Sequence, residues 1–224
     1  MSVHPPHRAA TEKSGVCLPA DLVIGYGHAL AAVAEDISLS RGTHYLLARN
    51  GRGKTTLLRT LAGLIRPVHG CCSVAGHCQF ISDELSFDRE LSSKLLLGSL
   101  LPRDRRREAF EFAEELELDL KKAFGKLSTG NRKKVGLLLA EFSIIPNSAN
   151  VVLFDEPFTG LDAPAREAFQ RRWHAADDNT VRIVSCHPDF DGMKMQSAVL
   201  ITDERISYGG NGVRSWADFK TQLN

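Results

Sequence analysis

The sequence predicts an α/β fold with a mainly parallel β-sheet, and two observations support this. Three apolar runs, 151–154, 181–185 and 198–202, predict buried strands, and a helical pattern at 164–174 lies between the first two. Apolar strands that alternate with helices are typical of a parallel sheet that is covered on both faces. The second observation is a glycine-rich segment at 48–56 that leads directly into another helical pattern. Open α/β sheets bind ligands at the carboxyl ends of their strands, so polar residues at those ends are candidate site residues.

Local patterns predict the remaining elements. Apolar runs separated by glycine-containing and polar turns indicate short strands before residue 48, in an N-terminal antiparallel β-subdomain. These strands are expected at 22–24, 34–39 and 45–47. Apolar residues at helical spacing indicate helices after it. These helices are expected at about 56–65, within 91–118 and at 131–142. The last two ranges indicate a helical region in the middle of the chain.

Length and composition limit the domain organisation. With 224 residues, the chain suits one α/β domain, which we expect at 19–224, after a loose N-terminal extension at 1–18. The first 15 residues lack the apolar core of a signal peptide. The longest apolar-leaning stretch, 22–34, is shorter than the about 20 residues that cross a bilayer. We therefore expect a cytoplasmic protein.

The charge balance and the cysteines argue against several other classes of protein. Lys and Arg number 28 and Asp and Glu 27, which argues against nucleic acid as a direct partner. Five cysteines in a chain that looks cytosolic argue against a disulfide framework. The segment 69–78, rich in cysteine and histidine, lacks the ligand spacing of a standard zinc module.

The glycine-rich segment predicts a phosphate-binding loop. Its glycines allow successive N–H groups to face the β- and γ-phosphates of a nucleotide, Lys54 reaches those phosphates, and the Thr55 hydroxyl ligates Mg²⁺. The helix that follows points its positive N-terminus at the same anion. The usual pattern begins with glycine where this chain has Ala48, which would cost about 1 kcal/mol if a positive φ were required there. The predicted nucleotide-binding residues of the loop are Ala48, Arg49, Asn50, Gly51, Arg52, Gly53, Lys54, Thr55 and Thr56.

About a hundred residues later, the run 151–156 provides an apolar strand that ends in two carboxylates. Beside the γ-phosphate, Asp155 would hold Mg²⁺, largely through water, and Glu156 would act as the general base toward the attacking water. The alternative for an Asp-Glu pair at a strand end is a helix or turn cap. The phosphate-binding loop upstream favours the catalytic interpretation, with a nucleoside triphosphate and Mg²⁺ as the ligands.

Four further motifs resemble those of one family. Residues 127–131, Leu-Ser-Thr-Gly-Asn, resemble the LSGGQ signature of ABC-type ATPases, and 159–162 resemble their D-loop. His187 resembles the switch histidine, and Tyr26 resembles the A-loop aromatic residue that stacks on adenine. All motifs stand in the order of the family, and the resemblance covers about residues 20 to 212. It implies a P-loop NTPase core with an N-terminal antiparallel β-subdomain and a short inserted α-helical subdomain at about 84–140.

The resemblance also implies how the site is completed. In the family two ATPase domains stack head to tail, and the signature of one chain contacts the γ-phosphate that is bound by the other. The signature residues would be Ser128, Thr129, Gly130 and Asn131. Thr129 and Asn131 depart from the family pattern, whereas the serine and the second glycine, which make the phosphate contacts, are present. Asp162 would belong to the D-loop, and His187 would bond the γ-phosphate and orient the water.

The glutamine loop of the family is the least regular match. Aligning 80–84 with its pattern of a strand followed by glutamine places Asp83 at the glutamine position. A carboxylate also ligates Mg²⁺, so Asp83 is a candidate metal ligand. The alternative is Gln79, four residues earlier.

From these features we expect the ATP-binding and ATP-hydrolysing subunit of an ABC transporter. It would dimerise with a second ATPase subunit on binding ATP and drive separate transmembrane permease subunits. Through these permease subunits it would lie at the inner face of the cell membrane. The short helical subdomain resembles single-domain export ATPases, including the haem-exporter type. Two alternatives stay open: a soluble ABC-type ATPase that acts on nucleic acid or the ribosome, and a regulatory module with low turnover, which Ala48 and Asp83 favour.

Overall fold

The computed structural model of the protein describes residues 15–82, 84–186, 192–220, 222 and 223. Its strands are β1 Gly15–Leu18, β2 Val23–Gly25, β3 Ala29–Val33, β4 Ile37–Ser40, β5 Gly42–Ala48, β6 Ser73–Ala75, β7 His77–Ile81, β8 Asn150–Phe154, β9 Thr180–Cys186, β10 Lys194–Thr202 and β11 Arg205–Ser215. Its α-helices are α1 Lys54–Leu61, α2 Ser93–Leu100, α3 Arg106–Glu115, α4 Thr129–Phe142, α5 Ala163–Ala175 and α6 Trp216–Lys220.

An eight-stranded sheet forms the centre of the molecule, in the order β2-β3-β11-β10-β5-β9-β8-β7. The five strands from β10 to β7 are all parallel to one another, whereas β2 with β3 and β10 with β11 are antiparallel. A second, antiparallel sheet contains β4, β1 and β6. The predicted α/β class with a mainly parallel sheet is therefore confirmed.

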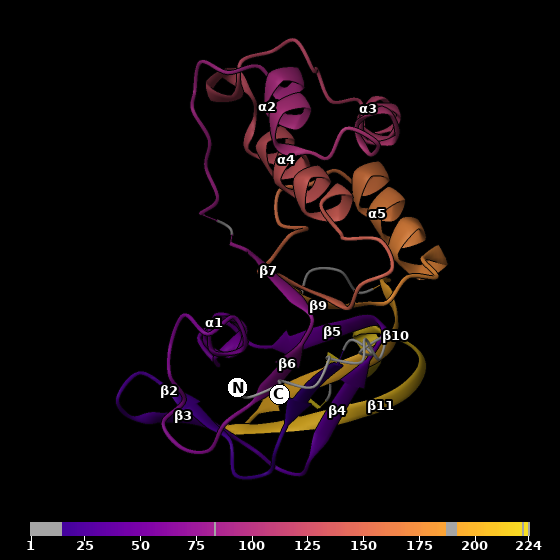
Figure 1. Ribbon diagram of the computed structural model, residues 1–224. Coiled ribbons are helices and arrows are strands. Elements are labelled where there is room, and N and C mark those ends of the chain that lie inside the picture. The colour runs from indigo at the N-terminus through magenta and orange to yellow at the C-terminus, as the bar shows by residue number, and fades with distance from the viewer. Residues whose placement is uncertain (1–14, 83, 187–191, 221, 224) are drawn as a thin grey trace, which may run out of the picture.

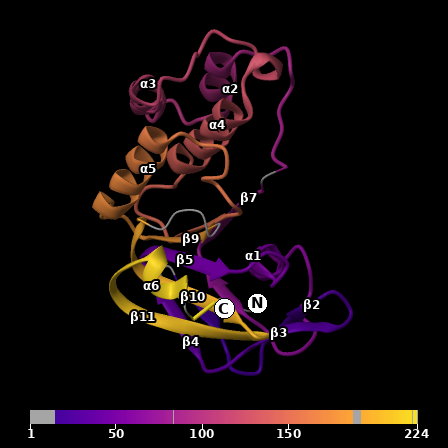
Figure 2. The ribbon, with the colours of Figure 1, turned by 180° about the vertical axis from the view of Figure 1, so that it is seen from behind.

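The two faces of the large sheet pack against different layers. On β8, Val151 and Leu153 contribute to a core with α1 and the small sheet, while Val152 and Phe154 contribute to a core with α3, α4 and α5. This alternation follows from the two-residue period of a strand. Seen from both sides, α2, α3 and α4 lie together at one end of the molecule, and α5 lies next to α4 (Figure 1, Figure 2). The predicted helical range 84–140 contains α2, α3 and most of α4.

Several predicted boundaries differ from the structure. The strand expected at 34–39 begins only at Ile37, as β4, because residues 34–36 form the connection after β3, which ends at Val33. The helical range 91–118 is interrupted between α2 and α3, where Leu101 is extended with φ −84° and ψ 148°. Pro102 follows it, and a proline disfavours helical backbone at the residue before it. The helix expected at 56–65 begins at Lys54 and ends at Leu61.

The predicted loose extension at 1–18 is wrong at its C-terminal end. Gly15–Leu18 forms β1, which pairs with β4 on one side and with β6 on the other. Val16 and Leu18 are buried in the core under α1. A run as short as Gly-Val-Cys-Leu gives only a weak strand signal by itself. It forms a strand because it pairs with β4 and β6, which are distant in the sequence. Residues 1–14 lie outside the described part of the chain.

Candidate nucleotide site

The phosphate-binding loop connects the central strand β5 to α1. Gly51 and Gly53 have positive φ angles of 76° and 107°, which favour glycine. A Cβ atom on Gly53 would also lie 3.0 Å from Cδ2 of Leu30. Ala48, in contrast, is the extended last residue of β5 and pairs with Ile201 of β10. The alanine at the first position of the loop therefore carries no penalty for a positive φ.

Lys54 lies at the start of α1 with 5% of its surface exposed. Its Nζ donates to the carbonyl oxygen of Ala48 at 3.3 Å and to Oδ1 of Asn50 at 3.4 Å. It also forms an ion pair with Oε1 of Glu156 at 3.5 Å. The ammonium group is thus held in the loop by oxygen atoms, in a position where phosphate oxygens can replace them.

A cavity of about 430 Å³ opens over this loop. It brings together residues from the loop, from the start of α1 and from the segment after β8, which the sequence places about a hundred residues apart. The lining consists of Asn50, Gly51, Gly53, Lys54, Thr55, Thr56, Glu156 and Thr159. Six of the nine loop residues predicted from sequence therefore line one space with the predicted general base, whereas Ala48, Arg49 and Arg52 are not part of this lining.

Thr55 and Asp155, the predicted Mg²⁺ ligands, are in direct contact. The Thr55 hydroxyl donates to Oδ1 of Asp155 at 3.1 Å, and the Ser185 hydroxyl donates to the same oxygen at 3.0 Å. Burial raises the pKa of the Asp155 carboxyl group, while the bonds from Thr55 and Ser185 oppose this rise. A hydroxyl and a carboxylate that converge in this way are oxygen ligands of the kind Mg²⁺ takes, so these residues fit the ion.

Ser185 is a site residue that the sequence analysis did not identify. It lies near the carboxyl end of β9, between β5 and β8 in the sheet. Besides its bond to Asp155, its Oγ accepts a hydrogen bond from the backbone N–H of Glu156 at 2.7 Å. A small polar residue inside the apolar run 181–186 was the signal that could have identified it.

The signature residues begin helix α4. Ser128 is the N-cap, and its Oγ accepts from the N–H of Asn131 at 3.3 Å. Ser128 and Thr129 are exposed, whereas Gly130 packs closely on residues 159–162: a Cβ atom on Gly130 would lie 2.5 Å from the carbonyl oxygen of Gly160. Within the described residues, the signature lies outside the lining of the phosphate cavity.

Asp162, the predicted D-loop residue, is the N-cap of α5. Its Oδ1 accepts from the N–H of Ala165 at 2.8 Å, and its Oδ2 accepts from Nζ of Lys134 at 2.7 Å. The bond from Lys134 lowers the pKa of the Asp162 carboxyl group. Lys134 is buried and also donates to the carbonyl oxygen of Leu116 at 2.8 Å, so it connects α4 to the start of α5 and to the end of α3.

The other predicted site residues differ in what the structure shows of them. Tyr26 follows β2 with 52% of its surface exposed, and its hydroxyl accepts from Nη1 of Arg59 on α1 at 3.4 Å. Asp83 and His187 lie outside the described residues. Gln79, the alternative to Asp83, pairs with Val152 within β7 rather than at the end of that strand.

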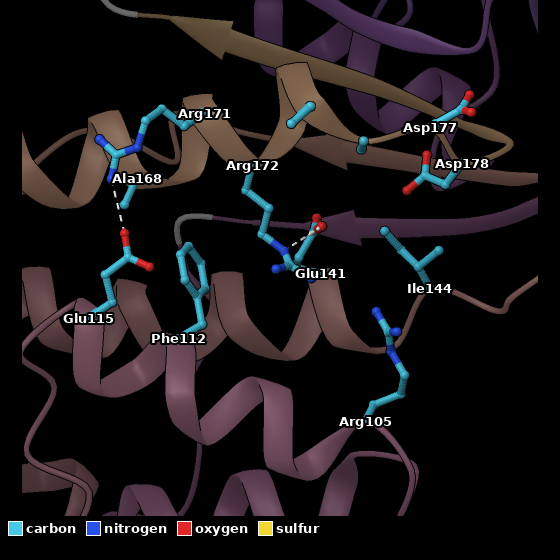
Figure 3. Close-up of a pocket in the computed structure, with 12 residues that line it drawn as sticks. Arg105, Phe112, Glu115, Glu141, Ile144, Ala168, Arg171, Arg172, Asp177 and Asp178 are labelled. Carbon is cyan, nitrogen blue, oxygen red and sulfur yellow. Dashed lines mark hydrogen bonds and ion pairs between the residues drawn. The ribbon is translucent and has the colours of Figure 1, made fainter.

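A second cavity of about 540 Å³ lies among α3, α4 and α5 (Figure 3). Four of its charged side chains form two ion pairs: Arg172 contacts Glu141 at 3.1 Å, and Arg171 contacts Glu115 at 3.0 Å. Glu141 is buried and also accepts from the indole N–H of Trp173 at 3.1 Å. These internal pairs hold the three helices together, and we assign the cavity a structural role.

Comparison with known proteins agrees with this geometry. Residues 36–159 match the profile of the family described as ABC transporter. The chain is 31% identical over 204 residues to the aliphatic sulfonates import ATP-binding protein SsuB 1 of Rhodococcus jostii, covering 84% of this chain and 80% of that protein. It is 33% identical over 163 residues to the cytochrome c biogenesis ATP-binding export protein CcmA of Novosphingobium aromaticivorans, covering 70% and 80%.

Solved structures share the fold. One described as the ATP binding subunit of an ABC transporter superposes with a TM-score of 0.67 at 22% identity, over 92% of each chain. The chain therefore belongs to the ABC transporter family, as an ATP-binding subunit with ATPase activity coupled to transport. The predicted family, fold and enzyme class are confirmed. No helix in the described part of the chain is long and apolar enough to cross a membrane.

Proposed function

We propose that the chain binds ATP together with Mg²⁺ in the cavity over the phosphate-binding loop and hydrolyses it there. The observation that carries this proposal is the meeting of two distant segments at the carboxyl edge of the sheet. Lys54 pairs with Glu156 at 3.5 Å, and Thr55 bonds Asp155 at 3.1 Å. The first pair places a cation that can bind the phosphates beside a carboxylate that can accept a proton from the attacking water. The second pair provides oxygen ligands for a metal ion.

Nucleotide entry would change the partners of these side chains. Lys54 would bind the phosphates in place of Glu156, and the Glu156 carboxylate would then be able to face the attacking water. Glu156 then accepts a proton from this water as the water oxygen bonds to the γ-phosphorus and the bond to the bridging oxygen of ADP breaks. Thr55 and Asp155 would hold Mg²⁺, whose charge would offset that of the phosphates.

The signature supports a dimeric site. Ser128 and Thr129 are exposed and lie away from the phosphate cavity of their own chain. We propose that the Ser128 hydroxyl and the N–H of Gly130 contact the γ-phosphate bound by a second ATPase subunit, as the family resemblance implies. His187, in its family role, would orient the water.

The transport partners are separate transmembrane permease subunits, which hold this chain at the inner face of the membrane, and the direction is export. Support for export comes from the short helical region and from the similarity to the export protein CcmA. Relatives named as import proteins are also similar, so direction is a separate question from ATP hydrolysis.

The test of hydrolysis is Glu156→Gln, which keeps the size of the side chain and removes the base. The variant should bind ATP, elute as a dimer in sizing chromatography with ATP and Mg²⁺, and show no turnover. Glu114→Gln, an exposed carboxylate on α3, serves as the control and should match the wild type. Turnover near the wild-type rate in Glu156→Gln would overturn the assignment of the base.

A further inference from the structure

We propose that Lys133, on helix α4, is a positioning residue that holds the backbone of Glu156 in the conformation needed for catalysis. The proposal rests on the proposed function, because it assumes that Glu156 is the general base. It concerns a contact between two residues that lie 23 positions apart in the sequence and that the sequence motifs do not connect.

Glu156 has an unusual backbone. Its φ angle is 48°, in the left-handed region that residues with a side chain avoid. Pro157 follows directly and restricts the backbone of Glu156 further. Such a conformation persists where the surrounding structure over-determines it, and it is found at active sites for that reason.

Hydrogen bonds hold this residue on both sides. Its N–H donates to Oγ of Ser185 at 2.7 Å. Its carbonyl oxygen accepts from the N–H of Thr159 at 3.3 Å and from Nζ of Lys133 at 3.0 Å. The bond from Lys133 is the shorter of the two at the carbonyl and has a charged donor, which makes it the stronger.

The Lys133 bond differs from the Thr159 bond in what it fixes. Thr159 is three residues from Glu156 and belongs to the same turn, so their bond moves with the turn. Lys133 comes from the first turns of α4, which packs in the core behind β8. It also lines a cavity of about 240 Å³ together with Asp155 and Pro157. The ammonium group thus ties the turn that carries the general base to a rigid helix.

The functional consequence is a specific one. Glu156 contributes little to ATP binding, because the phosphates contact Lys54 and the loop N–H groups. Loss of the Lys133 bond should therefore affect the chemical step and leave nucleotide affinity unchanged. A displacement of about 1 Å at a catalytic group can reduce the rate by about 100-fold.

The test compares two substitutions at this position. Lys133→Met keeps the length of the side chain and removes the donor, and we expect kcat to fall by about 10- to 100-fold with KM for ATP within about twofold of the wild type. Lys133→Arg keeps a charged donor and should retain kcat within about threefold. Lys122→Met, which removes an exposed lysine elsewhere on the helical region, controls for the loss of charge and should match the wild type.

A general structural role would give a different result. It would lower the melting temperature and the affinity for a fluorescent ATP analogue together with kcat, and this pattern would overturn the proposal. If Lys133→Met does not fold, Lys133→Gln, whose side chain is shorter and cannot span the same distance, carries the same comparison with Lys133→Arg.

The Glu156→Gln variant distinguishes a failure of the positioning role of Lys133 from a failure of the proposed function, in which Glu156 is the general base. If it is inactive while Lys133→Met turns over like the wild type, the positioning role is wrong and the proposed function stands. If Glu156→Gln is active, both fail. In the Glu156→Gln background, adding Lys133→Met should leave ATP affinity and the ATP-dependent dimer unchanged, because Lys133 acts only through Glu156.

Discussion

Oγ1 of Thr55 lies 3.1 Å from Oδ1 of Asp155, although 100 residues separate them in the chain. The hydroxyl comes from the first turn of α1 and the carboxylate follows β8, while Ser185 of β9 bonds the same oxygen from the strand between β5 and β8. Three segments therefore meet at one carboxylate at the carboxyl edge of the sheet. The geometry explains why the chemistry of this site depends on the parallel order of β5, β9 and β8.

The buried carboxylate of Asp155 should lower the stability of the folded state while it supports Mg²⁺-dependent ATPase activity. Burial raises the pKa of Asp155 above its ordinary value of 3.8. The folded state then binds this proton more tightly than the unfolded state, so this contribution to stability falls as pH rises from 3.8 to the folded pKa and stays lost above it. Asp155→Asn should therefore melt at a higher temperature than the wild type at pH 7 without nucleotide, and should lose Mg²⁺-dependent ATPase activity.

Thermal melting between pH 3.5 and 8, with ATPase assays across a Mg²⁺ titration, checks both parts of this expectation. The difference in melting temperature between the variant and the wild type should shrink toward low pH. An Asp155→Asn protein with normal Mg²⁺-dependent turnover would contradict the assigned metal role.

The exposed ring of Tyr26 should bind the adenine. Tyr26→Ala removes about 1 to 2 kcal/mol of aromatic contact, which weakens ATP binding from several-fold to tens-fold. Tyr26→Phe is the matched control and should bind normally, because the bond of the hydroxyl with Arg59 is long, at 3.4 Å, and lies at the surface. Titration with ATP provides the measurement. Equal affinities for a folded Tyr26→Ala protein and the wild type would indicate a packing role instead.

The contact between Gly130 and Gly160 should make the signature intolerant of a methyl group. In Gly130→Ala the new Cβ would lie 2.5 Å from a backbone oxygen, so α4 or residues 159–162 must shift. Overpacking of this kind costs about 1 to 3 kcal/mol, and we expect a lower melting temperature with at least a tenfold lower ATPase rate.

Gly136 on the same helix provides the control for that substitution. A Cβ atom there would meet only the end of the Leu85 side chain, at 3.3 Å. Alanine also favours helical backbone over glycine, so Gly136→Ala should be close to neutral in stability and activity. Similar losses in both variants would mean that the Gly130 contact has no special role.

The glutamine-loop position stays a prediction, since Asp83 lies outside the described residues. If Asp83 faces Mg²⁺ and the γ-phosphate, Asp83→Gln should preserve or raise ATPase activity, because it removes a negative charge from that position. Asp83→Ala should weaken metal-dependent turnover. Rates measured across a Mg²⁺ titration check this, and identical curves for the wild type and Asp83→Ala would assign the role to another residue.

Sequence patterns were most informative where function depends on consecutive residues. The loop at 48–56 and the strand with its carboxylates at 151–156 lie where they were predicted, because phosphate binding and metal binding both need fixed residue types at fixed spacing. Short strands were less predictable: Gly15–Leu18 and Ala29–Val33 are strands because of their partners, β4 and β6 for the first, β2 and β11 for the second.

The sequence by itself determined the fold class, the family and the residue types that we propose meet the phosphates. The tertiary structure alone decided which side chains support them. Ser185 bonds both Asp155 and Glu156, and it lies 29 residues from Glu156 in the sequence. Lys133 bonds the carbonyl oxygen of Glu156 and lies 23 residues from it. Such contacts depend on how helices and strands pack against one another, and the spacing of residues along one chain segment does not specify that packing.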